Sequence, residues 1–299
     1  MPILVLLLIA IAAGSLVFLL GSRYPTPLIG EAPAQAAGEK LGDEAVRHPR
    51  LSRLLRRRLD PATATGLALT VALAAVVVGG LVLGLLAYLM RTNTALAQID
   101  NSVGQWEVDH GTRLSTHALQ LVTDLAGTYV VVIVIVVVTI VEYLRVPNKW
   151  IPVFLVTVVV GEIALVTTVK ESLDRVRPAF NPAAASLGPS FPSGHSATAA
   201  ALYAAVALVT ARRRAPRTRA LIAGAAAAVG VGVACSRVLL GFHWLSDVVA
   251  GLAFGWAWFS ICAIAFGGRF LTFGAPVEKA TRIAEQETSR TPETSVIRK

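Results

Sequence analysis

The chain has 299 residues, of which 55% are hydrophobic and only 15% are charged, and its mean hydropathy is +0.66. Ordinary soluble domains carry about 25% charged residues, so this composition excludes a soluble or disordered protein, and two cysteines exclude a disulfide scaffold. The net charge of +9 is typical of a membrane protein with basic cytoplasmic loops. We therefore expect membrane lipids, and no nucleic acid, as partners.

Seven apolar runs are long enough to be considered as membrane-spanning helices, which need about 20 residues each. They are Pro2–Leu20, Gly66–Met90, Leu119–Leu144, Trp150–Val169, Ser196–Ala211 (which can extend back to Ser193), Ala220–Leu240 and Trp244–Gly267. The first run could instead be a cleaved signal peptide, with an Ala-x-Ala-like site at 32–34. Because no basic n-region precedes it, we favour an uncleaved anchor. The sequence thus predicts an all-α integral membrane bundle.

The distribution of positive charge orients these helices. If the loop after the first helix is cytoplasmic, 21 Lys and Arg residues lie inside and 6 lie outside. Because Lys and Arg resist translocation, this bias predicts a multi-pass protein of the cell membrane whose C-terminus is cytoplasmic. The six outside residues are Arg91, Arg113, Lys170, Arg175, Arg177 and Arg237.

Three segments outside the spans have their own patterns. In the linker of residues 21–65, leucines beside arginines between Arg50 and Leu59 fit either a helix on the inner leaflet or a solvated linker. The outer segment 91–117 predicts a short interfacial helix anchored by Trp106. The tail is polar and predicted to be disordered. We expect an anchor and linker at 1–65, a six-helix domain at 66–268 and a tail at 269–299.

Three polar clusters lie at the predicted outer helix ends. The first is Lys170 with Arg177 and Pro178, the second is Pro192-Ser193-Gly194-His195, and the third is Ser236-Arg237 with His243 and Asp247. Seven residues are about two helical turns, so Lys170 and Arg177 are expected on one face if that helix continues. Ser193 and Gly194 at a helix N-terminus form a potential anion site. Because His243 and Asp247 are four residues apart, the carboxylate can orient the imidazole.

Together these side chains are suited to phosphate chemistry. Lys170, Arg177 and Arg237 would neutralise the phosphoryl oxygens in the transition state. His243, held by Asp247, could attack phosphorus. His195 would then protonate the leaving oxygen and later activate water.

The three clusters resemble those of the type 2 phosphatidic acid phosphatase (PAP2) family, which contains the lipid phosphate phosphatases and is related to the haloperoxidases. Its pattern is K-x6-RP, PSGH and SR-x5-H-x3-D, and every fixed position is matched here. The resemblance implies a six-helix core, here with one extra N-terminal helix, and a metal-independent phosphatase without a cofactor. It further implies a phosphohistidine on His243 and a general acid at His195. The apolar runs argue against the soluble vanadium haloperoxidase branch.

Other polar residues receive simpler interpretations. We expect Arg175 to anchor the headgroup region, and His48, His110 and His117 to be surface residues. Asp124 and Glu142 are expected to reach opposite interfaces, and Glu162 to balance the cationic cluster without a direct catalytic role.

The predicted function is dephosphorylation of a lipid at the outer face, since the clusters lie at headgroup depth. Candidate substrates are phosphatidic acid, phosphatidylglycerol phosphate, diacylglycerol pyrophosphate and polyprenyl pyrophosphate, and the residues do not choose among them. A phosphotransferase that uses the same phosphohistidine is the first alternative. A non-catalytic phospholipid-binding or transport protein is the second. No obligate protein partner is evident, and the abundance of Ala, Val and Arg over Lys suggests a bacterial source.

Overall fold

The computed structural model describes residues 2–23, 84, 88, 94–184 and 186–270. Within these ranges the chain is helical and contains no strand. The longer helices are α1 (Pro2–Arg23), α5 (Thr94–His110), α6 (Arg113–Thr123), α7 (Thr128–Arg145), α8 (Trp150–Leu173), α9 (Gly194–Ala211), α10 (Pro216–Leu239) and α11 (Leu245–Phe270). Single 3₁₀ turns form at Asp124–Ala126 and Pro182–Ala184. The prediction of an all-α fold is confirmed.

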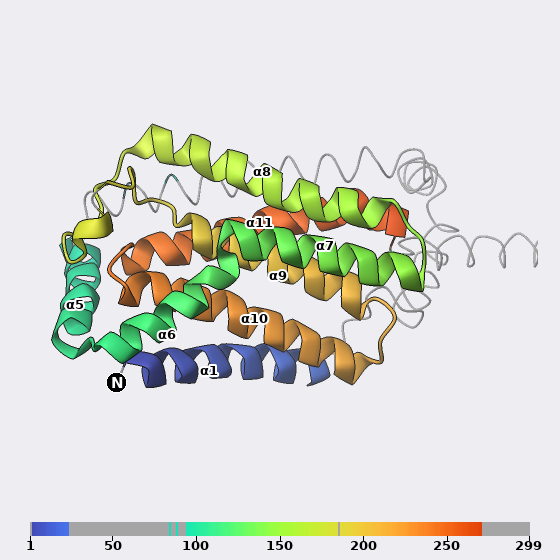
Figure 1. Ribbon diagram of the computed structural model, residues 1–299, viewed down its shortest axis with the longest axis horizontal. Helices are drawn as coiled ribbons and strands as arrows, with labels where there is room; N and C mark the ends of the chain where they lie inside the picture. The colour runs from blue at the N-terminus through green and yellow to red at the C-terminus, as the bar shows by residue number, and fades with distance from the viewer. Residues whose placement is uncertain (1, 24–83, 85–87, 89–93, 185, 271–299) are drawn as a thin grey trace, which may run out of the picture.

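Six of the described helices are long and apolar enough to cross a membrane: α1, α7, α8, α9, α10 and α11. They run alongside one another in a bundle (Figure 1). The seventh predicted span, Gly66–Met90, lies almost entirely outside the described residues, as do the linker of residues 24–65 and the tail from residue 271. The predicted roles of those segments, and of His48, stay predictions.

Helix α9 lies at the centre of the bundle and packs against α8, α10 and α11. Its alanine-rich sequence lets neighbouring backbones come close, as small residues do in membrane helices. At Gly251 of α11, an added Cβ would lie only 2.5 Å from the carbonyl oxygen of Ser193. Glycine is therefore required at this position. Because it has no side chain, α11 can approach the start of α9 closely.

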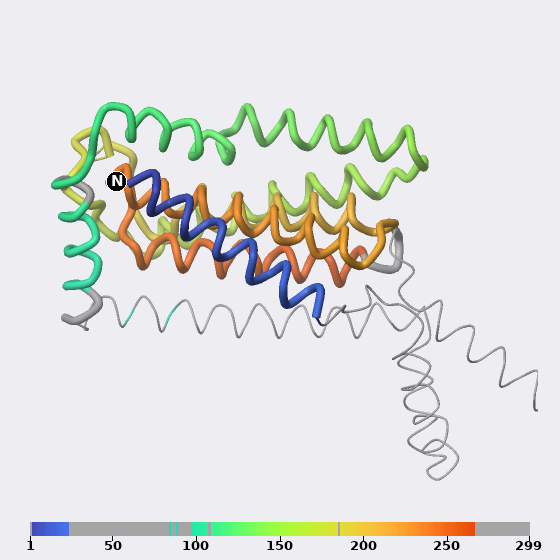
Figure 2. Tube along the Cα trace, turned by 90° about the horizontal axis from the view of Figure 1, so that it is seen from below, coloured from blue at the N-terminus to red at the C-terminus, as the bar shows by residue number. Residues whose placement is uncertain are grey.

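Helix α1 packs along α10, and Figure 1 shows the two side by side. Near its N-terminus, Leu6 joins Leu119, Leu239 and Leu240 in a buried cluster. Trp106 of α5 also packs against this cluster, so its predicted role as an interfacial anchor is incomplete: its ring contacts the bundle as well. Helix α5 lies across the end of the bundle, transverse to the long helices (Figure 2).

Two predicted helices differ from those in the structure. The run Leu119–Leu144 was expected as one span, but a 3₁₀ turn at Asp124–Ala126 and an extended Gly127 (φ −71°, ψ 151°) divide it into α6 and α7. The segment 91–117 was expected to hold one short helix, yet it contains α5 and the start of α6. The second helix begins at Arg113, with Thr112 as its N-cap in a capping box with Ser115.

Candidate active site

The three predicted clusters meet at one end of the bundle. Lys170 is in the last turn of α8, Ser193 precedes α9, Arg237 is in the last turn of α10, and Asp247 is in the first turn of α11. Because these helices alternate in direction, two C-termini and two N-termini share this end. The predicted convergence of the clusters is therefore present in the structure.

Arg177 lies in the irregular segment after α8 and not on the helix, because α8 ends at Leu173 and Asp174 adopts a left-handed conformation (φ 40°). The expectation that Lys170 and Arg177 share a helix face, which required the helix to continue, is wrong. The irregular segment nevertheless brings Arg177 close enough to Lys170 for an electrostatic interaction. The Arg177 guanidinium is buried and donates at 2.8 Å to the carbonyl oxygens of Gly188 and Phe242. These bonds fix its position beside the loop that follows α10.

Ser193 is a buried N-cap of α9. Its hydroxyl oxygen accepts hydrogen bonds from the backbone N–H of Ser196 at 3.5 Å and from the Ser196 hydroxyl at 2.9 Å, and its own N–H donates to the carbonyl oxygen of Asp247 at 3.0 Å. In the described part of the chain, the N–H groups of Gly194 and His195 have no partner. Free N–H groups at a helix N-terminus attract anions, so at this site the backbone contributes more to an anion site than the serine side chain.

Arg237 is buried, with 6% of its surface exposed. Its Nη1 donates to Thr123 Oγ1 at 3.3 Å, and its guanidinium lies over the Phe242 ring, 4.2 Å from the ring centroid. Its Nε is also buried but has no hydrogen-bond partner among the described residues. An unpaired buried donor is unfavourable by about 1–3 kcal/mol. The Nε–H group is therefore suited to donate a hydrogen bond to an oxygen of a bound anion.

His243 lies between Asp247 and Arg177. Gly241 (φ 67°) reverses the chain after α10, which places His243 Nδ1 3.4 Å from Asp247 Oδ2 and His243 Nε2 3.3 Å from Arg177 Nη1. The predicted contact of His243 with Asp247 is present. Since Asp247 accepts and Arg177 donates, these contacts assign the proton to Nδ1 and the lone pair to Nε2.

The environment of His243 keeps the imidazole neutral. Burial lowers its pKa to about 4; Asp247 opposes this shift, whereas the cations Arg177 and Arg237 favour it. His195, across the site, is half-buried and interacts electrostatically with Arg237, His243 and Lys170. The site thus contains one oriented, neutral imidazole and a second, less constrained one.

Arg175 is not a headgroup anchor, which corrects the prediction. It donates hydrogen bonds to Asp247 Oδ1 and, at 2.8 Å, to Ser246 Oγ, and it forms an ion pair with Asp100 at 2.9 Å. Asp100 is a buried residue of α5 that also accepts from the backbone N–H of Ser246 at 3.0 Å. Sequence reasoning gave Arg175 another role and gave Asp100 none. No sequence pattern distinguishes Asp100 from Glu107 and Asp109, the other acidic residues of α5.

Two further buried carboxylates, Glu142 and Glu162, have other partners. Glu142 pairs with Arg145 at 2.8 Å and with Arg212 at 3.1 Å, so it is held by ion pairs and does not simply reach the interface. Glu162 is fully buried and accepts from Thr198 Oγ1 at 2.8 Å. Its principal contact is thus a hydroxyl, although it also interacts electrostatically with Lys170.

Comparison with known proteins identifies the region that carries these clusters. Residues 151–270 match the model of the PAP2 superfamily. The matched segment runs from α8 to the end of α11. The resemblance noted from the motifs is confirmed, and all three motif clusters fall within the matched residues.

Curated relatives match part of the chain. Lipid A 1-phosphatase from Rhizobium etli is 39% identical over an alignment of 123 residues, and the match covers 38% of this chain and 49% of that protein. The Rhizobium johnstonii lipid A 1-phosphatase is 40% identical over 136 residues (42% and 52%), and phosphatidylglycerophosphatase B from Bacillus subtilis is 39% identical over 88 residues (29% and 43%). The chain spans about half the length of the curated relatives it matches.

A solved structure shares the fold. The transmembrane PAP2-type phosphatidylglycerolphosphate phosphatase from Bacillus subtilis superposes with a TM-score of 0.60 at 26% sequence identity. The match covers 66% of this chain and 98% of that one. The prediction of a PAP2-type helical membrane fold is therefore supported by a membrane protein of known structure. The first helix of the predicted six-helix core, Gly66–Met90, lies almost entirely outside the described residues.

Proposed function

We propose that the protein is a membrane-embedded lipid phosphate phosphatase that acts through a phosphohistidine on His243. One observation carries this proposal: the unprotonated Nε2 of His243 points to Arg177 while Asp247 holds Nδ1. A neutral imidazole that presents a lone pair beside a cation is arranged to attack an electron-poor phosphorus atom bearing anionic oxygens. The unpaired Nε of Arg237 supports the same function, because it can donate a hydrogen bond to a phosphoryl oxygen.

The proposed reaction has two steps, transfer of the phosphoryl group to His243 and hydrolysis of the phosphohistidine. First, His243 Nε2 attacks phosphorus, the bond from phosphorus to the leaving oxygen breaks, and His195 donates its proton to that oxygen. Next, His195 takes a proton from water, the water oxygen attacks phosphorus, and the P–N bond breaks to restore neutral His243. Lys170, Arg177, Arg237 and the N–H groups at the start of α9 stabilise the phosphoryl oxygens in both steps.

The residues at the site support catalysis without a metal ion or cofactor. The carboxylate in direct contact with His243, Asp247, is already engaged by His243, by Arg175 and by the backbone N–H of Trp244 at 3.0 Å. The other charged groups that surround His243 are cations, which repel metal ions and attract phosphate. The phosphoryl charge would thus be neutralised by side chains that the chain itself supplies.

A phosphorylated lipid is the substrate class that this position supports best. The site lies at the ends of apolar helices, where a phosphate tethered to a lipid can enter from the side. The charge distribution supports an extracytoplasmic site, with the C-terminus in the cytoplasm. Named relatives act on lipid A and on phosphatidylglycerol phosphate, and these are the first substrates to try.

The test is phosphate release from purified lipids in mixed micelles, comparing the wild-type protein with the His243→Gln variant. Wild-type protein should release phosphate from at least one phosphomonoester or pyrophosphate lipid, whereas the variant should release none above background. Phosphate that instead appears on an added lipid or glycan alcohol would identify a phosphotransferase. Binding without turnover in the wild type would overturn the proposed function.

A further inference from the structure

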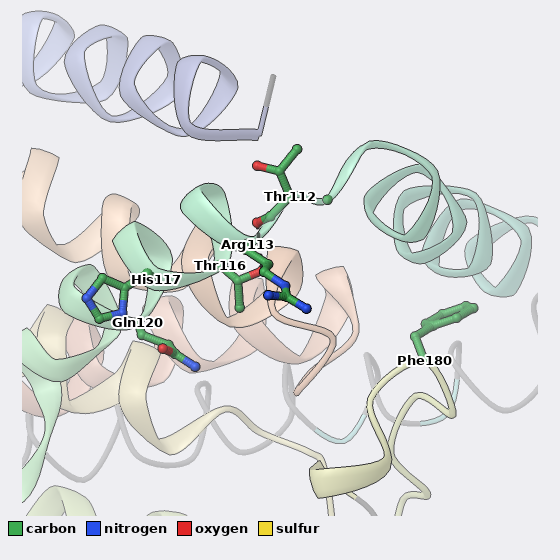
Figure 3. A pocket seen from close by; sticks show the side chains of 7 residues that line it. Thr112, Arg113, Thr116, His117, Gln120 and Phe180 are labelled. Carbon is green, nitrogen blue, oxygen red and sulfur yellow. Dashed lines mark hydrogen bonds between the residues drawn. The ribbon is translucent and has the colours of Figure 1, made fainter.

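An open surface depression of about 530 Å³, here called the cavity, is lined by Gly111, Thr112, Arg113, Thr116, His117, Gln120 and Phe180. Arg113 and Gln120 extend from α6 toward the space that separates this helix from Phe180 (Figure 3). Ligand sites are typically cavities of about 300–1,000 Å³ with a few convergent polar groups. The volume of the cavity lies within this range, and Arg113, His117 and Gln120 supply the polar groups.

The cavity adjoins the phosphate site on both of its sides. Along α6, Thr123 is three residues beyond Gln120 and accepts the hydrogen bond from Arg237. On the opposite side, Phe180 Cβ would be 3.6 Å from a Cβ added at Gly241, two residues before His243. Gln120 is thus within one helical turn of a residue that contacts Arg237, and Phe180 packs close to the short loop that holds His243.

The cavity-lining side chains of Arg113, His117 and Gln120 have no hydrogen-bond or ion-pair partner within the described residues. Arg113 is also unfavourably placed for helix stability, because it occupies the first position of α6 and the positive end of a helix dipole disfavours a cation. It is one of the outside arginines that neither the charge bias nor the motifs explain. A ligand anion would compensate for both features.

We propose that this cavity is a second headgroup subsite, in which Arg113, assisted by His117 and Gln120, binds a further phosphate group of the same lipid headgroup. This inference rests on the proposed function, since the first phosphate is the one attacked by His243. The capping box between Thr112 and Ser115 fixes the start of α6, so Arg113 is presented from a defined position. The subsite selects lipids whose headgroup carries two phosphates over lipids that carry one.

The test compares two lipids at equal mole fraction in mixed micelles. Phosphatidylglycerol phosphate has a phosphodiester in addition to its terminal phosphate, whereas phosphatidic acid has the terminal phosphate alone. For Arg113→Gln, kcat/KM should fall about tenfold or more with phosphatidylglycerol phosphate and stay within about twofold with phosphatidic acid, as expected for one lost charge-assisted hydrogen bond. Arg217→Gln removes an exposed arginine at the other end of the bundle and should change neither value.

The possible failures are distinguishable. If the wild type releases phosphate but Arg113→Gln affects both lipids equally, or neither, the subsite is wrong and the phosphatase stands. If the wild type releases no phosphate from any lipid, the proposed function itself fails. If added inorganic phosphate slows phosphatidic acid turnover more in the wild type than in Arg113→Gln, the cavity binds the free ion, and its assignment to the headgroup is overturned.

Discussion

The guanidinium of Arg175 donates a hydrogen bond to the carboxylate of Asp247, on the oxygen that does not face His243. Its other terminal nitrogen pairs with Asp100 at 2.9 Å. His243, Asp247, Arg175 and Asp100 thus form a continuous chain of contacts from the loop after α10 to the transverse helix α5. Arg175 is a positioning residue: it acts on the imidazole through Asp247.

The first prediction concerns this chain of contacts. Arg175→Ala should lower kcat about tenfold to a hundredfold with little change in KM, because a misplaced nucleophile loses attack geometry while the phosphate-binding cations remain. Asp100→Asn should have a smaller effect in the same direction. Steady-state kinetics on one lipid, with melting temperatures of each variant, measure both quantities.

Arg212→Ala is the matched control, because it breaks a buried ion pair with Glu142 that is remote from His243. Both arginine variants should lower the melting temperature, since each leaves a buried carboxylate with fewer partners. Only Arg175→Ala should lower kcat. Equal losses of kcat in the two variants would show that Arg175 matters for stability alone.

Much of the candidate site follows from local sequence. The spacing of His243 and Asp247 is one helical turn, so their contact could be expected before any tertiary structure was known. The start of α9 at Gly194 likewise follows from Ser193 as a cap. The contact of Arg175 with Asp100 could not be expected in this way, because the two residues are 75 positions apart and α5 lies transverse to the bundle. The division of 119–144 by Gly127 was missed because the apolar pattern continues through it.

The second prediction separates the roles of the two histidines. His243→Gln should form no phosphoenzyme and should lose orders of magnitude in rate, because no other side chain in the described part of the chain presents a lone pair in this position. His195→Gln should still form some phosphoenzyme with a good leaving group but hydrolyse it slowly. Rapid-quench labelling should therefore detect an acid-labile phosphoprotein that accumulates only in the His195 variant. Equal labelling of both variants would contradict this division of roles.

The third prediction concerns the unpaired Nε of Arg237. Vanadate adopts the five-coordinate geometry of the transferring phosphoryl group, so it should inhibit turnover and be held by the same donors. Arg237→Lys keeps the charge but removes the guanidinium fork, and it should weaken vanadate inhibition and kcat/KM by similar factors of about ten or more. Dose–response curves and kinetics on the same preparations test this correlation.

The same preparations test independence from metal ions. EDTA should leave wild-type turnover unchanged, because cations of the protein itself occupy the positions that metal ions would take in a metallophosphatase. Arg213→Lys, an exposed substitution at the opposite end of the bundle, should match the wild type with vanadate and with EDTA. Loss of activity in EDTA that Mg²⁺ restores would contradict the proposed chemistry.

A further prediction concerns the protonation state of His243. Burial lowers its pKa from 6.5 to about 4, so the imidazole should remain neutral at pH 5.5, where an exposed histidine is largely protonated. The chain has five histidines, few enough for ring-nitrogen NMR of ¹⁵N-histidine-labelled protein in micelles. The His243 signals, assigned by their absence in His243→Gln, should keep the two separate shifts of a neutral ring.

Stability should follow the same lowered pKa. Between pH 6.5 and about 4 the unfolded chain binds a proton at residue 243 that the folded chain does not, so the stabilising contribution is complete above pH 6.5 and is lost as the pH falls toward 4. The melting temperature of the wild type should therefore drop more steeply over this range than that of His243→Gln, which has no such group. His117→Gln, which removes an exposed imidazole, should keep the steep wild-type dependence. Two results together would contradict this prediction: a ring signal of His243 that titrates with a midpoint near 6.5, and equal acid sensitivity of all three proteins. They would show that burial does not keep the imidazole neutral, and the assignment of a free lone pair at Nε2 would then be wrong.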